Sequence, residues 1–573
     1  MKIFGKEIIK HKYAWHKFYK KNERDIKVPN VSLYEYLVER NKDNLNSIAL
    51  SYFDNKTNFK DFIEQINMCA RAFRSQGIRP GDVVTICMPN TPEAVISLYA
   101  VNKIGAIANM IHPLSAEEEI KHSLISTNSV MLVTVNISYD KIKNIIDDTN
   151  VYKTIIVSPG DSMPTLLKFG YYITQGRKVH VPKSSEDNLF WHEFISKGSH
   201  YKEKVLAKTS SSQPALILHS GGTTGVPKNI VLTNGNINAV CKQAEIAFEE
   251  VDKTDKMLSI LPFFHCFGLV VGLHVPLCLG ASCYLIPQFD AKRFDKLLSK
   301  YKPTLVPGVP TLFEALMNNK HMEGMDLSNL KYVISGGDTL SVEKNRKVNE
   351  FLRAHNCKKN VMQGYGMTET SGPITFGAMG SDVLGSVGIP LPGNIVKIIN
   401  VDTKEECKPG ETGEICACGP TVMLGYLDNE KETNEILEKD KKGRIWVHTG
   451  DLGYMNEDGV LFFCSRLKRM LIVSGYNVYP SHIEEVLMKH PAILNCGVIG
   501  IPHPYKVQVP KAYIVLKPDV KVSSKIKSEI KEFCEKNLAK YMLPKEFEFK
   551  ESLPKTLIGK VNYRELENEE KHN

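Results

Sequence analysis

Residues 215–228 read ALILHSGGTTGVPK. The apolar start, Ala215 to His219, predicts a buried strand, and the apolar run at 230–232 predicts a second strand after the segment. Between them, glycines, hydroxyl side chains and Lys228 predict a loop whose backbone N–H groups hold phosphate oxygens. A flexible surface loop is the alternative, but the Pro-Lys ending before a strand favours the phosphate loop. The spacing differs from a Walker loop, and no G-x-G-x-x-G follows a strand, so a dinucleotide fold lacks support.

Around this segment the sequence predicts α/β units. Apolar runs at 83–87, 130–135 and 154–157 alternate with helical stretches, an order typical of largely parallel sheets. Residues 160–208 mix Gly, Pro, Ser and Lys, and we expect them to form a peripheral excursion. Three capping boxes of the form S-x-x-E are predicted to open helices: Ser32 to Glu35, Ser115 to Glu118, and Ser481 to Glu484.

Composition sets the class of protein. The chain has 573 residues, of which 42% are hydrophobic, and its net charge is 73 − 64 = +9. That length predicts three or four structural units, and the composition excludes a disordered chain. No apolar run approaches the ~18 residues that a membrane-spanning helix needs. The mild charge and the lack of a recognition motif argue against nucleic-acid binding. The 13 dispersed cysteines predict free thiols in a reducing compartment, with the cytoplasm as the default.

The N-terminal segment differs from the rest. Residues 1–30 hold nine Lys or Arg against three Asp or Glu. Their large apolar residues fall near one face of a helix: Phe4, Ile8, Trp15, Phe18 and Tyr19. Such a basic amphipathic segment can lie on an anionic membrane surface, or it can form a helix packed on its own domain. The second interpretation is favoured.

A second change in composition lies at the short basic run SRLKR, residues 465–469. About 105 residues follow it, enough for a small α+β domain. The expected organisation is an N-terminal extension at 1–30, a large domain at 31–465, a hinge at 466–469 and a small domain at 470–573.

The segment 220–228 resembles the signature S-[SG]-G-T-T-G-x-P-K-G of the adenylate-forming superfamily, which includes acyl-CoA synthetases, luciferases and adenylation domains of peptide synthetases. Asn229 replaces the usual final glycine. Further motifs follow in the family's order over residues 30–570. The resemblance implies a large α/β domain of two mixed sheets and a distorted β-barrel, followed by a mobile α+β domain. It also implies that the phosphates of ATP bind to Ser220, Gly221, Gly222, Thr223, Thr224, Gly225 and Lys228.

Residues 363–370, QGYGMTET, resemble the family's Y-G-x-T-E motif. The resemblance implies that Tyr365 stacks on adenine and that Thr368 contacts the α-phosphate. A carboxylate beside triphosphate oxygens requires a cation between them, so Glu369 is the Mg²⁺ candidate, with Thr223 as its companion. The neighbours Gln363, Gly364 and Gly366 complete the expected nucleotide site.

Three other matches complete the nucleotide site. Gly336, Gly337 and Asp338 lie in a loop that resembles the one passing the adenine. His448-Thr449-Gly450-Asp451 resembles the T-G-D motif, in which Asp451 would accept both ribose hydroxyls. Arg466 would contact the ribose or the phosphates.

The C-terminal motif is PKTLIGK, residues 554–560. The resemblance implies that Lys560 is the lysine that bridges the carboxylate and the α-phosphate during adenylation. The small domain would then rotate about Lys468. After rotation, Gly475 and Tyr476 would face the arm of coenzyme A, with Gly475 leaving room for it.

The segment 261–269, LPFFHCFGL, resembles a stretch of acyl- and aryl-CoA ligases in which His265 would line the carboxylate end of the substrate site. It contains no acid to pair with an ammonium group, so amino acids are disfavoured. Gly308 and Gly364 would leave depth in the acyl pocket, which favours a medium- or long-chain fatty acid.

The implied reaction uses ATP, Mg²⁺ and CoA to convert a carboxylic acid into an acyl-CoA through an acyl-adenylate. The sequence leaves two rivals open. One is an adenylating enzyme that loads a separate carrier protein, and the other is a catalytically silent nucleotide-binding protein. Lys560, Glu369 and Asp451 argue against the silent protein. Oligomeric state is not determined.

Overall fold

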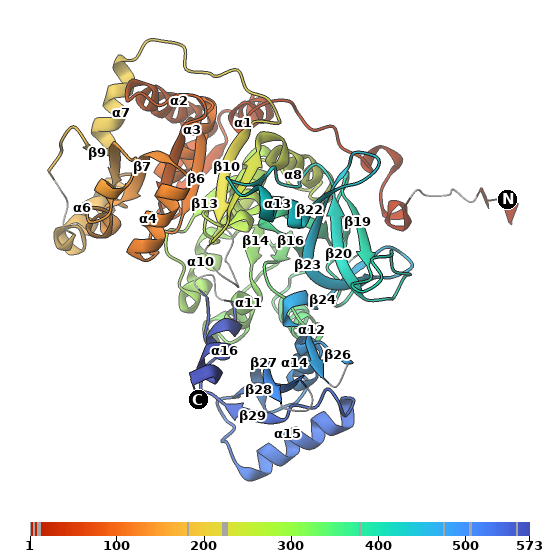
Figure 1. The fold of residues 1–573 in the computed structure, drawn as a ribbon. Helices are drawn as coiled ribbons and strands as arrows, with labels where there is room; N and C mark the ends of the chain where they lie inside the picture. Colours follow the sequence, from red (N-terminus) through yellow and green to blue (C-terminus); the bar gives the residue numbers. More distant parts are fainter. Residues whose placement is uncertain are drawn as a thin grey trace.

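The computed structural model describes residues 2–3, 6–7, 13–179, 183–219, 227–377, 380–381, 383–473, 476–503, 507–556 and 560–572. The chain forms a large N-terminal domain and a small C-terminal domain that lies below it in Figure 1. The fold class that the resemblance implied is confirmed: two mixed sheets and a further barrel-like sheet precede a small α+β domain.

The first sheet has eight strands in the order β21-β11-β10-β6-β5-β7-β8-β9, parallel from β10 to β9 and antiparallel at β11 and β21. Its strands are β21 (Gly425–Tyr426), β11 (Asn229–Thr233), β10 (Pro214–His219), β6 (Ile107–Ile111), β5 (Val83–Cys87), β7 (Ser129–Val135), β8 (Lys153–Val157) and β9 (Asn188–Phe190). The predicted strands at 83–87, 130–135 and 154–157 match β5, β7 and β8. The helices of this part are α2 (Phe59–Ser75), α3 (Pro92–Lys103), α4 (Glu117–Ser126), α5 (Tyr139–Ile142), α6 (Thr165–Thr174) and α7 (Trp191–His200).

The second sheet has nine strands in the order β18-β17-β16-β15-β14-β12-β13-β3-β4. Its strands are β18 (Ile389–Pro390), β17 (Gly372–Phe376), β16 (Val361–Met367), β15 (Tyr332–Ser335), β14 (Leu305–Gly308), β12 (Lys256–Ser259), β13 (Ser282–Leu285), β3 (Ile48–Tyr52) and β4 (Asn55–Asn58). Its helices are α1 (Leu33–Asn41), α8 (Asn234–Ala247), α9 (Val275–Cys278), α10 (Phe294–Tyr301), α11 (Pro310–Met317) and α12 (Val342–Ala354), with a π-helix at Phe267–His274.

The third sheet completes the large domain. It contains β19 (Ile395–Ile399), β20 (Gly413–Cys418), β23 (Ile445–Met455), β22 (Leu437–Lys439) and β24 (Leu461–Arg466), with α13 (Glu430–Ile436) beside it. The C-terminal domain has β25 (Leu471–Val473), β26 (Tyr476–Val478), β27 (Ile493–His503), β28 (Val507–Leu516) and β29 (Glu546–Phe549), with α14 (Pro480–Met488), α15 (Ser524–Asn537) and α16 (Tyr563–His572). All strands of this last sheet come after residue 470.

The main core lies where the first two sheets meet. Every residue of α3 is buried, and its apolar residues belong to the same cluster as residues of β5 and β12. A helix that is mostly apolar all round is expected to be enclosed in this way. The core therefore fixes the two sheets against each other, and the strand ends that carry the candidate site are held by it.

Two of the three predicted capping boxes were misplaced. Ser32 and Glu35 form the box that opens α1. At α4, however, the N-cap residue is Ala116 and its partner is Glu119, one position later than predicted. At α14 the helix begins at Pro480, because proline fits the first helical position. Ser481 instead donates from its hydroxyl to the Cys464 carbonyl oxygen.

The N-terminal segment packs on its own domain. Within 13–30 the structure has two short 3-10 helices, Ala14–Phe18 and Lys21–Glu23, rather than one amphipathic helix. Trp15 and Tyr19 are both only 6% exposed and pack with residues of the barrel-like sheet region. Phe4 and Ile8 lie outside the described residues.

All 13 cysteines are free, as their dispersed pattern predicted. Eleven of them are buried, and no disulfide links them. Among the described helices, none combines the length and the apolar character that crossing a bilayer requires.

Candidate active site

The strand pair β23 and β24 brings Asp451 opposite Arg466 in register. Asp451 is 3% exposed; its Oδ2 accepts a hydrogen bond from the Tyr365 hydroxyl at 2.9 Å, and its Oδ1 lies 3.1 Å from Arg466 Nε. Oδ1 lacks an aligned hydrogen bond among the described residues. Burial raises the pKa of Asp451, and Arg466 acts in the opposite direction. Three residues predicted from separate motifs thus meet, with one carboxylate oxygen still open to a donor.

Glu369 lies in the 3-10 turn Thr368–Thr370 and is 7% exposed. Its Oε1 accepts a hydrogen bond from the Tyr426 hydroxyl at 3.0 Å. Burial raises the pKa of Glu369, while hydrogen bonds and the charges of Arg466 and Lys228 lower it. The predicted metal residue is therefore a buried carboxylate inside a cationic setting.

Lys228 connects this group to the end of the phosphate loop. Its Nζ lies 2.6 Å from Glu432 Oε2 and 4.7 Å from the centre of the Tyr426 ring. Neither Tyr426 nor Glu432 was predicted, because they are about 200 residues from Lys228 and belong to no motif that the sequence analysis used. Only the antiparallel contact of β11 with β21 brings them together.

Lys560 comes from the C-terminal domain and reaches the large domain. Its backbone pairs with Thr556, whose N–H donates to the Lys560 carbonyl oxygen at 2.8 Å. A Cβ added to Gly337 would lie 3.9 Å from Lys560 Cε, so the lysine side chain lies against the Gly336-Gly337 loop. Burial lowers the pKa of Lys560, and the nearby charges of Asp338 and Asp451 raise it. The predicted adenylation lysine and the predicted ribose carboxylate therefore share one site.

His265 lies near enough to Lys560 for the lysine charge to act on it. Its Nδ1 accepts a hydrogen bond from the Phe267 N–H at 3.3 Å. Burial, and then the charge of Lys560, lowers the pKa of His265 to about 4. The imidazole is therefore neutral near pH 7, as an uncharged wall for a substrate carboxylate requires.

Gly366 of the predicted motif allows two backbone segments to pack closely together. A Cβ on Gly366 would collide with the Gly372 carbonyl oxygen on the neighbouring strand, so β16 and β17 can approach only with glycine there. The expectation that Gly308 leaves depth for an acyl chain was wrong in detail. The space beside Gly308 is filled by Leu312 and Phe313, and Phe376 lies against Gly364.

The T-G-D segment is supported from β20. Glu414 accepts a hydrogen bond from the Gly450 N–H at 3.1 Å, and its other oxygen lies 3.1 Å from His448 Nδ1. Contacts with Cys416, Glu414 and Glu438 raise the pKa of His448 to about 11, so it is a cation at neutral pH. Glu414 and His448 thereby hold the backbone of the T-G-D segment, which carries Asp451.

Asn229, which replaces the usual glycine, anchors the strand after the phosphate loop. Its Nδ2 donates to Ser126 Oγ at 2.9 Å, and its carbonyl oxygen accepts from the Leu427 N–H at 2.8 Å. The exit of the loop is thus tied to α4 and to the segment that carries Tyr426.

Several predicted residues lie outside the described parts or lack a described side chain. The residues of the phosphate loop that lie between the described ranges ending at 219 and beginning at 227 are Ser220, Gly221, Gly222, Thr223, Thr224 and Gly225, and Gly475 also lies outside the described residues. Tyr476 is placed in β26, but its side chain is not described. Gln363 is buried, Thr368 is half-buried, and Asp338 and Lys468 are exposed.

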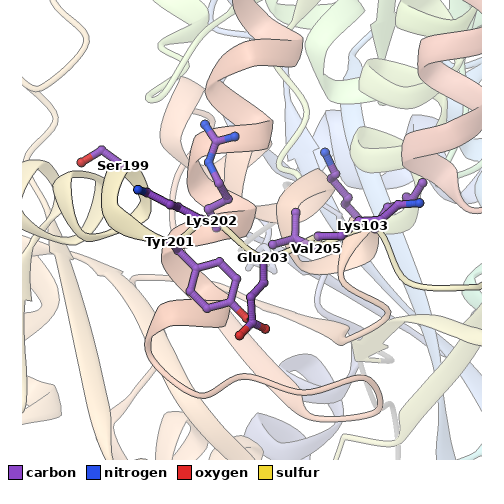
Figure 2. A pocket seen from close by; sticks show the side chains of 9 residues that line it. Lys103, Ser199, Tyr201, Lys202, Glu203 and Val205 are labelled. Carbon is purple, nitrogen blue, oxygen red and sulfur yellow. The ribbon is translucent and has the colours of Figure 1, made fainter.

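A cavity of about 540 Å³ lies elsewhere, between α2, the end of α3 and the segment after α7. Figure 2 shows its lining side chains, which include Lys103, Tyr201, Lys202 and Glu203. None of the predicted site residues lines it. It is therefore separate from the candidate active site.

Both parts of the chain match families of known proteins. The profile of the AMP-binding enzyme family matches residues 37–427, and that of the AMP-binding enzyme C-terminal domain matches residues 482–560. The long-chain-fatty-acid–CoA ligase of Bacillus subtilis is 33% identical over 555 residues, which cover 96% of each chain. The corresponding ligase of Haemophilus influenzae is 34% identical over 86% of each chain.

Among solved structures, the anthranilate CoA ligase AuaEII in complex with anthranoyl-AMP superposes with a TM-score of 0.83. It shares 24% sequence identity, and the match covers 96% of this chain and 98% of that one. At this identity the likeness concerns the fold, including both domains.

Proposed function

The chain belongs to the family of AMP-binding enzymes, and from that membership we infer that it is an AMP-forming acid–thiol ligase whose acid is a long-chain fatty acid. The observation that supports the proposal is that the Lys560 side chain of one domain lies against the Gly336-Gly337 loop of the other, where its charge acts on Asp451 and His265. The fatty acid comes from relatives that carry this activity in their names at 33% and 34% identity over most of the chain.

In the first half of the reaction, a substrate carboxylate attacks the α-phosphate of ATP and pyrophosphate leaves. We assign Asp451 to the two ribose hydroxyls, because it is a buried acceptor with an open oxygen. Tyr365 and Arg466 hold this carboxylate in place. Thr368, Gln363 and the Gly336-Gly337 loop would complete the nucleotide site.

Mg²⁺ fits the residues present. Glu369 is a buried carboxylate in a cationic setting, and Mg²⁺ is commonly held by one or two carboxylates together with substrate phosphates. Glu369 would hold the ion with Thr223, and the ion supplies charge neutralisation for the phosphates. Lys228, at the end of the loop, would add a fixed cation.

Lys560 would act at the reacting centre. Charge builds on the oxygens around the α-phosphate during the transfer, and a cation positioned there lowers the barrier. Burial lowers the pKa of Lys560, and the charges of Asp338 and Asp451 raise it. His265, which is neutral, would line the path of the carboxylate without repelling the lysine.

In the second half, the thiol of CoA attacks the acyl-adenylate and AMP departs. Lys560 occupies the site in this structure, so the small domain must move before the thiol can enter. We propose Lys468 as the hinge, since it is exposed and lies in the single turn Leu467–Arg469 between β24 and β25. Gly475 and Tyr476 would then line the thiol channel.

The alternative acceptor is a separate carrier protein. The relatives named as CoA ligases favour CoA, and the half-reaction with ATP is the same in both cases. Trp15 and Tyr19 are buried in the domain, so they do not insert into a membrane. The membrane contact that we propose for residues 1–30 is therefore made by their Lys and Arg side chains. Thirteen free thiols support a reducing compartment such as the cytoplasm.

The test is mass-spectrometric detection of thioesters with ATP, Mg²⁺, CoA and a pooled set of acids from acetate through C8 to C18 fatty acids to aryl acids. The expected product is a long-chain acyl-CoA with AMP in equal amount. AMP and acyl-adenylate without any CoA thioester would instead place the carrier-protein activity first. An aryl-CoA product would refute the fatty-acid assignment while preserving the reaction.

A further inference from the structure

Helix α6, Thr165–Thr174, exposes large apolar side chains that a water-facing helix does not need. Leu166 is 83% exposed, Phe169 64%, Tyr172 63%, Leu167 48% and Ile173 41%. No residue of the helix is buried. A contiguous exposed apolar group of this kind in a globular protein marks a surface that meets another apolar phase.

The spacing of the apolar residues of α6 places them on the face of the helix that points away from the protein. Leu166, Phe169 and Ile173 are three and four residues apart, so they share one face of the helix. Tyr171 lies on the opposite face and is the one half-buried residue of the helix, with its ring against Gly160. The helix therefore rests on the domain through Tyr171 and presents the apolar face to solvent.

The charges around the helix have one sign. Between Asp161 and Glu186 the sequence contains no acidic residue. The same stretch carries four Lys or Arg that are described and exposed. Arg177, Lys178 and Lys183 follow the helix in the sequence, whereas Lys168 Nζ lies 3.9 Å from Asp161 Oδ1. An apolar face flanked by cations matches a surface with an apolar interior and anionic headgroups.

The segment before the helix is firmly held. The Ser162 hydroxyl donates to the buried Glu93 at 2.5 Å, and Asn55 Nδ2 donates to the Ser162 carbonyl oxygen at 2.9 Å. The Tyr52 hydroxyl donates to the Pro159 carbonyl oxygen at 3.0 Å. The helix is therefore displayed from an anchored base at the outer edge of the first sheet (Figure 1).

We propose that α6, with the cations of 168–183, docks the protein on an anionic lipid bilayer. Leu166, Phe169 and Ile173 enter the boundary between headgroups and acyl chains, and the lysines and arginines contact the headgroups. Docking is a property of this surface and does not rest on the proposed reaction. It would bring an enzyme for long-chain acids to the phase into which such acids partition.

The test measures binding of the full-length protein to vesicles of phosphatidylglycerol and phosphatidylcholine by co-sedimentation. The double variant Leu166→Gln/Phe169→Gln keeps good helix formers and removes the apolar face. We expect its partition coefficient to fall at least about tenfold. The matched control Val522→Gln/Leu494→Gln changes two exposed apolar residues of the other domain and should bind as the unaltered protein does.

A second variant separates the charge contribution. Arg177→Gln/Lys178→Gln should weaken binding to anionic vesicles several-fold, with little change for vesicles of phosphatidylcholine alone. Equal vesicle binding by the Leu166→Gln/Phe169→Gln variant and the unaltered protein would overturn the proposal. So would sedimentation showing a dimer that this variant abolishes, because α6 would then be a contact between copies.

Ligase turnover of a short, water-soluble acid distinguishes the two proposals. The α6 variants should retain this turnover if the protein is a ligase. Loss of vesicle binding with turnover intact supports docking. Vesicle binding that depends on α6 in a protein without ligase activity would leave docking standing and remove the proposed function.

Discussion

The two sides of the candidate active site are built in different ways. On the large domain, Asp451 and Glu369 are buried carboxylates that each accept a hydrogen bond from a tyrosine of the same domain. On the small domain, Lys560 reaches the site across a boundary and is buried by residues of the other domain, such as Gly337. The difference teaches that, on the proposed roles, the nucleotide-binding groups are held within one domain, whereas the position of the other domain brings the reacting cation to them.

The largest effect is expected when the side chain of Lys560 is removed. Lys560→Ala should lower the rate of acyl-adenylate formation by about a thousandfold, because a cation is lost where charge develops. Conversion of supplied acyl-adenylate to thioester should change little. Pyrophosphate release and thioester formation, measured separately, check this. An equal loss in both half-reactions would show that Lys560 is needed in both domain positions.

The next largest effect is expected at Asp451, in the large domain. Asp451→Asn keeps the shape but replaces one acceptor oxygen with a donor and removes the ion pair with Arg466. A hydrogen bond to a charged group is worth about 1.5–3 kcal/mol, so KM for ATP should rise by roughly ten- to a hundredfold. The KM for the fatty acid serves as the internal control. If kcat fell instead, with KM for ATP unchanged, Asp451 would act on the reacting centre rather than on the ribose.

A smaller effect is expected at the tyrosine beside Glu369. Tyr426→Phe deletes the hydroxyl that donates to the carboxylate and retains the ring beneath Lys228. We expect KM for Mg-ATP to rise about fivefold, which corresponds to the roughly 1 kcal/mol net contribution of one hydrogen bond. Titration with Mg²⁺ at fixed ATP checks whether the change lies in metal use. Tyr454→Phe, at a half-buried tyrosine of β23 that stacks on Phe462, provides the matched loss of a hydroxyl.

The smallest expected effect is on the pH dependence of stability, which reports how His265 of the large domain is buried near Lys560 of the small domain. The folded pKa of His265 is lowered to about 4, whereas an unfolded histidine titrates near 6.5. Between these values the unfolded chain binds the extra proton, so the histidine's contribution to stability falls as pH falls from about 6.5 to 4. At pH 5.5 the loss is about 1 kcal/mol. Glu369 and Asp451, whose pKa values are raised, act in the opposite sense.

Comparison with His265→Gln isolates this contribution, because both proteins keep the two carboxylates. Urea midpoints at pH 7, 6 and 5 should fall more steeply in the unaltered protein than in His265→Gln. Identical slopes would show that His265 titrates normally and is open to water. Lys560→Met should make the slope slightly shallower, because the lysine charge is the lesser cause of the lowered pKa.

Much of this fold follows from local patterns. The strands β5, β7 and β8 were predicted because continuous apolar runs bounded by polar residues suit buried parallel strands. The cap of α4 was misplaced because three consecutive Glu residues, 117–119, compete as the partner, and the cap of α14 because Pro480 takes the first helical position. Chemistry-bearing residues in compact motifs, such as Asp451 and Glu369, were also found.

Residues that act through tertiary contact were missed. Tyr426 lies in β21, which pairs with β11, and Glu432 lies in the helix α13 that follows it. Their nearness to Lys228 depends on that long-range pairing, which the sequence does not reveal. The acyl pocket was misjudged at Gly308, because the sequence does not reveal that Leu312 folds back over it. The sequence analysis placed α6 only within a peripheral excursion at 160–208 and did not identify its apolar face, since periodicity does not distinguish a face covered by protein from one left open.

The open oxygen of Asp451 has a consequence for the choice of nucleotide. On the proposed role, this buried carboxylate oxygen, which already lies 3.1 Å from Arg466 Nε, gains an aligned donor when the sugar arrives with both hydroxyls. A 2′-deoxynucleotide would supply one hydroxyl fewer and leave that oxygen with the arginine alone, and a hydrogen bond to a charged group is worth about 1.5–3 kcal/mol. The enzyme would therefore discriminate ATP from dATP at this one atom, so that activating fatty acids would draw on the ribonucleotide pool and spare the precursors of DNA.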